Sequence, residues 1–316
     1  MITVLAGGVG AARYLAGLVQ VVAPHDITAV VNTGDDTTLH GLRICPDLDT
    51  VTYTLAGASN TTLGWGLEGE TWQAMDALSR LEAHAPAGSA AGATWFRLGD
   101  RDLATHLYRS QRLAEGAPLS TVTVELVAAW NLELTLVPMT DDRVATMVTV
   151  ACEGEIGFQD YFVRLRHGVP VSGVRFDGID RSRPAPGVLA AIDGAERIVI
   201  APSNPVVSIG PVVAVPGIAD RLRARRDDVV AVSPIVAGAA LKGPADRMLV
   251  ELGHEATVAG VARLYAPLVA TLVVDEADAA LAPQVEAAGV RCVVSPSVMH
   301  GPPEAAALAR ATLGMP

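Results

Sequence analysis

Residues 2–36 read ITVLAGGVGAARYLAGLVQVVAPHDITAVVNTGDD: an apolar run, a glycine turn, a stretch of helical length and a second apolar run. The apolar runs Ile2–Ala6 and Ile27–Val31 have the length and the β-branched content of buried strands. Residues 11–22 between them are typical of a helix. Because strands joined through a helix pair in parallel, this opening predicts a βαβ unit in an α/β fold.

The C-terminal half repeats this pattern. Continuous apolar runs, expected of parallel strands that helices cover on both faces, lie at 197–201, 229–232, 271–274 and 291–294. The pattern differs between about residues 57 and 186, with helical stretches near 71–83 and 102–113 and a β-like stretch at 145–150. We therefore expect a doubly wound, mainly parallel core formed by 1–56 and 187–316, and a smaller inserted α/β lobe formed by 57–186.

Composition limits the functions that the chain can have. The net charge of −11 argues against a protein that binds nucleic acid, since that binding uses Lys and Arg to neutralise phosphates. Lys242 is the only lysine; it could reach a phosphate or simply be exposed. The three cysteines are far apart, the N-terminus lacks the basic segment of a signal peptide, and no apolar run is long enough to span a membrane. These features predict a soluble cytoplasmic protein.

Four carboxylates follow the second apolar run. Asp35 and Asp36 come directly after it, and Asp47 and Asp49 follow within fifteen residues. Ligands of open α/β sheets collect beyond the carboxyl ends of the strands, and clustered acids there bind Mg²⁺ or move a proton. Capping and turn formation are the alternative for either pair.

Side-chain direction divides each pair of acids. Asp35 and Asp36 are adjacent, so on an extended chain they point in opposite directions. If a helix begins at Pro46-Asp47, Asp47 and Asp49 lie roughly 200° apart around its axis. Each pair should thus contribute one site residue and one structural residue, and the choice between Asp35 and Asp36 stays open.

Glycines between the first strand and the first helix suggest a phosphate loop. The sequence Gly7-Gly8-Val9-Gly10-Ala11-Ala12-Arg13 would let backbone amides approach an anion at a helix start. It lacks the Gly-Lys-Ser/Thr ending of a P-loop, and Arg13 stands where a dinucleotide fingerprint needs a small residue. A tight packing turn is the alternative.

Two further segments carry polar groups near predicted strand ends. Residues 201–211 are too rich in proline for a helix and too apolar for a flexible loop, and they include Ser203, Asn204 and Ser208; Ser233 follows the next strand. These side chains suit a base or a phosphate, although turn capping would also explain them. Asp102 and His106 lie at i,i+4 on a predicted helix and could share a metal. A cap plus a helix-surface pair is favoured there, since no third ligand is identifiable.

Taken together, eight segments in order over nearly the whole chain closely resemble the 2-phospho-L-lactate transferase family of coenzyme F420 biosynthesis. They are Gly7–Gly10, Asn32–Asp36, Pro46–Val51, Leu98–His106, Met139–Asp142, Phe158–Val163, Pro202–Pro211 and Val232–Ile235. The opening Gly-Gly-Val-Gly-Ala-Ala-Arg is most similar to the actinobacterial, phosphoenolpyruvate-type branch.

The resemblance implies a Rossmann-like core, a homodimer and an Mg²⁺-dependent transferase. In the implied reaction the ribityl hydroxyl of the deazaflavin Fo attacks the β-phosphorus of an enolpyruvyl- or lactyl-diphosphoguanosine, giving dehydro-F420-0 or F420-0 and GMP. The sequence does not choose between the two donors.

Site roles also follow from the resemblance. Asp49 and Arg97 correspond to deazaflavin contacts, and Asp35, Asp36 and Asp49 are the metal and catalytic candidates. The residues implied to bind the guanosine diphosphate are Gly8, Gly10, Ala11, Arg13, Ser203, Asn204, Ser208 and Ser233.

Two other functions fit parts of the sequence. A nicotinamide-dependent (NAD) oxidoreductase would explain the βαβ opening and an Asp soon after the second strand, but Arg13 weakens it. A non-enzymatic regulator that binds a nucleotide sugar would explain the glycine turn and the Asp-Asp pair. The stretch ending at His106 favours the transferase.

Overall fold

A computed structural model describes residues 1–62, 64–86 and 88–315. Its central sheet has seven parallel strands in the order β14-β13-β10-β9-β1-β2-β5. These strands are β1 (Ile2–Ala6), β2 (Ile27–Val31), β5 (Thr135–Pro138), β9 (Arg197–Ile200), β10 (Val229–Val232), β13 (Thr271–Val274) and β14 (Arg291–Val294). The predicted doubly wound parallel sheet is confirmed.

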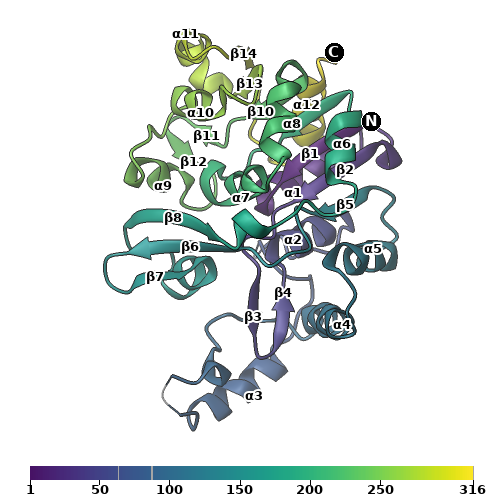
Figure 1. The fold of residues 1–316 in the computed structure, drawn as a ribbon, viewed down its shortest axis with the longest axis vertical. Helices are drawn as coiled ribbons and strands as arrows, with labels where there is room; N and C mark the ends of the chain where they lie inside the picture. The colour runs from purple at the N-terminus through teal and green to yellow at the C-terminus, as the bar shows by residue number, and fades with distance from the viewer. Residues whose placement is uncertain (63, 87, 316) are drawn as a thin grey trace.

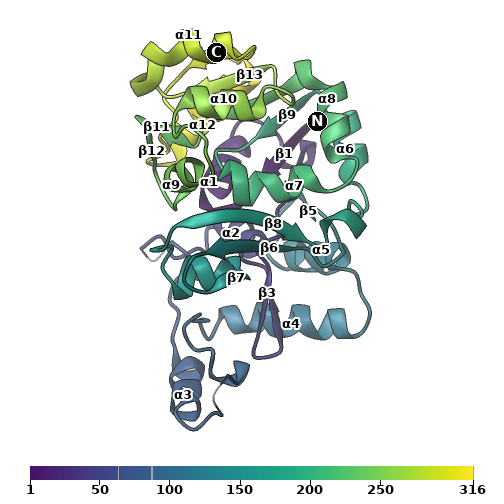
Figure 2. The same ribbon diagram turned by 60° about the vertical axis from the view of Figure 1, so that its left-hand side comes forward.

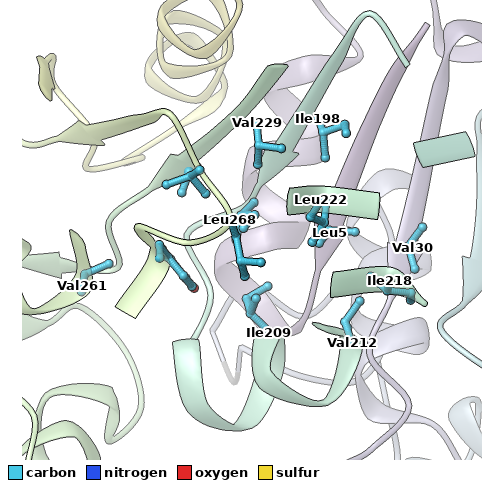
Figure 3. Packing of buried hydrophobic residues seen from close by; sticks show 14 of the residues in the cluster. Leu5, Val30, Ile198, Ile209, Val212, Ile218, Leu222, Val229, Val261 and Leu268 are labelled. Atoms are coloured by element: carbon cyan, nitrogen blue, oxygen red, sulfur yellow. The ribbon is translucent and has the colours of Figure 1, made fainter. Parts of the chain in front are cut away.

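Helices cover both faces of this sheet, and alternate strand residues enter two separate cores. Leu5 of β1 packs in one core with residues of α6 (Val188–Gly194), α7 (Gly210–Ala214), α8 (Ile218–Ala224) and α10 (Val258–Tyr265). Figure 3 shows Leu5, Val30 and Ile198 facing the helix residues of this core. Val4 and Ala6 point to the other core, with α1 (Gly8–Leu18), α2 (Pro46–Leu55), α5 (Leu119–Ala129) and α12 (Pro302–Leu313). Burial on both faces explains the continuous apolar runs.

Smaller elements extend from the sheet. A second sheet, antiparallel in the order β7-β6-β8, consists of β6 (Ala145–Val150), β7 (Gly154–Gly157) and β8 (Val171–Asp177). It crosses the middle of the elongated molecule, and α3 (Gln73–Glu82) and α4 (Asp102–Ala114) lie at the end away from the large sheet (Figures 1 and 2). Other elements are the hairpins β3 (Thr37–Leu39) with β4 (Leu42–Ile44) and β11 (Ile235–Val236) with β12 (Ala239–Ala240), and the helices α9 (Ala245–Glu251) and α11 (Ala282–Ala287).

Two segments lie elsewhere than the sequence predicted. Residues 135–138, which the sequence analysis assigned to the inserted lobe without predicting a strand there, form β5 and pair with β2 at the edge of the central sheet. Hairpin β3–β4 was expected in the core, but it projects toward α4 (Figure 1), and the amide of Arg43 donates to Ser110 Oγ at 2.8 Å. The division of the chain into a core and an inserted lobe at 57 and 186 stays a prediction.

Among the described residues, no single helix is long and apolar enough to cross a membrane. Two helical segments, Pro205–Ala214 and Ile218–Ala224, are long and apolar enough only when taken together, and they are bent by 92° relative to one another. Ile209, Val212, Ile218 and Leu222 of this pair pack in the core of Figure 3.

Candidate active site

The strand order reverses between β1 and β9, because the chain proceeds from β1 to one side of the sheet and from β9 to the other. Ligands of doubly wound proteins bind beyond the strand ends at such a reversal. The glycine loop follows β1, and the segment from Pro202 follows β9. Ser203 Oγ donates to the carbonyl of Gly7 at 2.8 Å, so the two loops are joined at this point.

Gly10 is required for this contact between the loops. A Cβ at Gly10 would lie 2.1 Å from the carbonyl oxygen of Pro202, closer than two atoms can approach. Gly8 has a φ of +69°, which favours glycine, and α1 begins there. Gly10 therefore has the packing role that the sequence analysis gave as an alternative to phosphate binding. The backbone of Gly8 lies at the start of α1.

The four carboxylates are all buried. They form two halves of a cluster, and each half contains one acid from each sequence pair. Asp35 and Asp47 form one half: the Asp47 charge acts on Asp35, and Asn32 Nδ2 donates to Asp47 Oδ2 at 2.9 Å. The amide of Gly8 faces the Asp47 carboxylate. No arginine or lysine pairs with either acid within the described ranges, and Asp35 Oδ1 has no hydrogen-bond partner there.

The other half is balanced by arginines. Arg43 Nη2 lies 2.9 Å from Asp36 Oδ2, and the Cys45 thiol donates to the same oxygen at 3.0 Å. Arg109 contacts both oxygens of Asp49, with Nη1 at 3.1 Å from Oδ2 and Nη2 against Oδ1. One acid of each sequence pair, Asp36 and Asp49, is thus held by an arginine, and which member of each pair acts in a site stays a prediction.

Crowding and burial change the acidity of the cluster. Burial first, and then the charge of Asp47, raise the pKa of Asp35 well above its usual range. Burial also raises the pKa of Asp36 to about 6, against the opposing charge of Arg43. The pKa of Asp47 rises to about 6, again mainly through burial. A cation near Asp35 and Asp47 would favour their ionised forms.

Helix α2 begins at Pro46, as the sequence suggested, and Tyr53 lies one turn after Asp49. Tyr53 Oη donates to Asp102 Oδ1 at 2.6 Å, and His106 Nε2 lies 3.2 Å from Asp102 Oδ2. Burial would raise the pKa of Asp102, but the hydrogen bonds from His106 and Tyr53 hold it below its usual value. Asp102 and His106 are buried partners rather than the helix-surface pair that the sequence favoured.

Asp49 supplies the third ligand that the sequence did not identify. One ligand atom each from Asp49, Asp102 and His106 lies within 4.8 Å of the others. The guanidinium of Arg109 already contacts both oxygens of Asp49, and it lies 3.3 Å from His106 Nδ1. A positive group in this position favours an ion-pair network over a metal site.

Arg109 is the important residue that the sequence analysis missed. It is 1% exposed and, with Asp102 and His106, makes up the buried residues of α4. These three polar residues stand at i, i+4 and i+7, the spacing that normally carries the apolar face of a helix. Polar residues at the positions where a helix normally carries apolar ones were the sequence signal that could have identified Arg109.

Arg97 lies in a different environment. Its guanidinium stands 4.9 Å from the ring centroid of Trp72, and Nη2 lies 3.0 Å from Asp76. Trp65 packs edge-on against Trp72, with ring centroids 5.6 Å apart. Arg97 is thus part of a half-exposed aromatic cluster beside α3, and its role as a deazaflavin contact remains a prediction.

Several predicted nucleotide residues have structural partners. Asn204 accepts hydrogen bonds from the amides of Val206 and Val207, and Ser233 Oγ closes a turn with Ile235. Ser208 is buried beside Gly7, where a Cβ on the glycine would meet it at 2.8 Å, and Ala11 is fully buried in the core under α1. Turn formation therefore explains Asn204 and Ser233, and the nucleotide roles of all four remain predictions.

Arg13 and Lys242 bring positive charge to this edge of the sheet. Burial and the charge of Arg13 lower the pKa of Lys242, so the two cations lie near one another. A Cβ on Gly64 would lie 3.1 Å from Lys242 Nζ, which places the loop around Gly64 beside them. Across the part of the chain that is described, neither cation forms a salt bridge with an acid.

Comparisons with solved structures agree with the fold. Two crystal structures of a Bacillus halodurans protein, one titled a member of the UPF0052 family, superpose with TM-scores of 0.65 and 0.60. Each covers 99% of this chain and 98% of the other at 17% and 16% identity, which defines a shared doubly wound α/β fold.

Sequence comparison then gives the family. The sequence model of the 2-phospho-L-lactate transferase CofD family matches residues 2–294. Proteins named phosphoenolpyruvate transferase from Streptomyces griseus subsp. griseus and Thermobifida fusca are 48% and 45% identical, and each match covers 99% of this chain and 97% of the relative. The chain belongs to the 2-phospho-L-lactate transferase CofD family and is a transferase. This assignment favours the transferase over the oxidoreductase and the regulator.

Proposed function

We propose that this transferase acts in coenzyme F420 biosynthesis, moving an enolpyruvyl-phosphoryl group from enolpyruvyl-diphosphoguanosine to the deazaflavin Fo. The ribityl hydroxyl oxygen bonds to the β-phosphorus, the bond from that phosphorus to the bridging oxygen breaks, and GMP leaves with that oxygen. The proton that the hydroxyl loses goes to the solvent. The name phosphoenolpyruvate transferase, shared by relatives 42–48% identical, supports the enolpyruvyl donor over the lactyl one.

The observation that carries the proposal is the uncompensated half of the acid cluster. Asp35 and Asp47 lie beside the glycine loop with raised pKa values, and Asp35 Oδ1 lacks a hydrogen-bond partner within the described ranges. Carboxylate oxygens of this kind suit Mg²⁺. Asp36 and Asp49, each held by an arginine, fit less well as direct ligands.

Mg²⁺ held by Asp35 and Asp47 would neutralise the diphosphate and the charge that develops on the leaving GMP. The amides at the start of α1, together with Arg13 and Lys242, would bind the phosphate oxygens. Asp49 would receive the acceptor hydroxyl, and Arg97 with Trp72 would contact the deazaflavin ring. A homodimer and a cytoplasmic location, both expected from the sequence, remain predictions.

Release of GMP tests this proposal. The purified enzyme, Mg²⁺ and enolpyruvyl-diphosphoguanosine should release GMP only when Fo is added, and chromatography would follow both. The lactyl donor, at the same concentration, should react more slowly. GMP release that does not depend on Fo, or tight donor binding with no turnover, would refute the proposed reaction.

Mg²⁺ should stabilise the protein more at neutral pH than at acidic pH. The folded-state pKa of Asp36 and Asp47 is about 6, whereas an unfolded Asp titrates near about 4. The folded state therefore keeps protons that the unfolded state loses, and without metal the stability falls as the pH rises through this window. Bound Mg²⁺ should reverse that loss.

Thermal unfolding measures this effect. At pH 7.5, saturating Mg²⁺ should raise Tm by several degrees, and at pH 5 by less than about half as much, since protons compete for the ligands. Asp35→Asn should abolish most of the increase. An Mg²⁺ effect of equal size at both pH values would argue against the acid cluster as the binding site.

Lys242→Gln should weaken donor binding selectively. Loss of a charged hydrogen bond to a phosphate predicts a donor KM about tenfold higher, with the Fo KM within about twofold of wild type. Initial rates of GMP release give both constants. Arg310→Gln, at an exposed position of α12, is the control and should change neither. An unchanged donor KM in Lys242→Gln would place the phosphates elsewhere.

A further inference from the structure

The buried Arg109 carries an inference beyond the proposed reaction. Its side chain is the largest among the fully buried side chains of the described residues. A guanidinium keeps its charge at every physiological pH, and burying it is costly unless its N–H groups are paired. The partners that it has inside the protein therefore indicate its role.

Arg109 connects α4 to the acid cluster. Its Nη1 and Nη2 donate to the two oxygens of Asp49, and Nη1 also lies 3.3 Å from the carbonyl of Arg43. His106 Nδ1, 3.3 Å from the same Nη1, must accept, since a guanidinium has only donors. On the other side of the ring, His106 Nε2 lies 3.2 Å from Asp102 Oδ2.

The same network fixes α4 against α2. Asp102 receives the hydroxyl of Tyr53, which lies one turn after Asp49 on α2, and Tyr53 Oη is also 2.8 Å from Thr105 Oγ1. Two separate links, Asp49 with Arg109 and Tyr53 with Asp102, therefore join these helices. They leave Arg109 little freedom to move relative to Asp49.

On the basis of the proposed function, we propose that Arg109 is a positioning residue that fixes the plane of the Asp49 carboxylate for the acceptor hydroxyl. A paired guanidinium uses one lone pair on each carboxylate oxygen and leaves the others free to accept a hydrogen bond. The pairing with Arg109 also makes Asp49 a poorer metal ligand, so that the metal would be bound by Asp35 and Asp47. Arg109 acts on the acceptor through Asp49 and touches no substrate itself.

Arg109→Lys tests this role, because lysine keeps the charge but loses the two parallel hydrogen bonds. The Fo KM should rise about tenfold, while the donor KM stays within about twofold of wild type. Arg112→Lys, on the same helix and paired with Glu115 and Glu125, is the matched control and should change neither KM. In an Asp49→Asn background, Arg109→Lys should raise the Fo KM no further.

A residue that only supports the fold would give a different result. Arg109→Lys would then reduce the amount of active enzyme and lower kcat with both KM values unchanged, and this outcome would overturn the inference. If Arg109→Lys does not fold, the pair Asp49→Asn with Arg109→Gln removes both charges and leaves neither unpaired. Its Fo KM should equal that of Asp49→Asn alone, and a KM several times higher would also overturn the inference.

The outcome for wild type separates this inference from the proposed function. If the wild-type enzyme releases no GMP with Fo and either donor, the proposed function itself is wrong. If the wild type reacts and Arg109→Lys keeps a normal Fo KM, only the positioning role fails.

Discussion

Asp35→Asn is expected to lower kcat at saturating Mg²⁺ by about a thousandfold, the scale of the charge stabilisation that a catalytic metal supplies. Burial and the neighbouring charge of Asp47 raise the pKa of Asp35 well above its usual range, and its Oδ1 has no hydrogen-bond partner within the described ranges. Asparagine has nearly the same shape but provides a neutral and weaker ligand. Rates of GMP release over a range of Mg²⁺ concentrations measure the effect.

Stability distinguishes this loss from a folding defect. Asp35→Asn removes a buried charge, so without metal at pH 7.5 its Tm should equal or exceed that of the wild type. Asp26→Asn, at an exposed position before β2, is the control and should keep full activity. Near-normal turnover of Asp35→Asn would exclude Asp35 as a metal ligand.

Gly10→Ala is expected to have the second large effect, on stability and donor binding together. The new Cβ would lie 2.1 Å from the carbonyl oxygen of Pro202, and backbone on both sides resists movement. Overpacking of this kind costs about 3 kcal/mol or more, and it would separate the two loops that follow β1 and β9. Denaturant unfolding and donor titration measure the two consequences.

Gly173→Ala is the matched control for this variant. A Cβ at Gly173 would meet Thr149 Oγ1 at 3.5 Å, an ordinary contact, so stability and donor binding should change little. If Gly10→Ala is as stable as Gly173→Ala and binds the donor normally, the glycine loop does not shape the donor site.

The parallel strands could be predicted from the sequence because their signal is local. Each is a short apolar run covered on both faces, as at Ile2–Ala6 and Ile27–Val31, and the predicted bounds of these two match the structure. Strand β5 was not predicted, because Thr135–Pro138 is only four residues long and follows β2 by about a hundred residues. Its pairing with β2 depends on the free edge of the sheet in the folded protein, and no local sequence pattern encodes that edge.

The acid cluster was predictable as a group but not in its internal pairing. The position of Asp35 and Asp36 after a strand and of Asp47 and Asp49 on a helix indicated a site. Their division depends on Arg43, which the β3–β4 hairpin brings back to Asp36, and on Arg109 from α4, sixty residues after Asp49. Such contacts depend on tertiary packing, so the sequence could not show which acids remain without a cation.

The mass of the deazaflavin product tests the central claim most directly. Wild-type enzyme, Mg²⁺, Fo and enolpyruvyl-diphosphoguanosine should give one phosphodiester with the mass of dehydro-F420-0 for each GMP released. Mass spectrometry of a single turnover would show both products. Fo recovered unmodified, or carrying GMP in place of the enolpyruvyl-phosphoryl group, would contradict the proposed transfer.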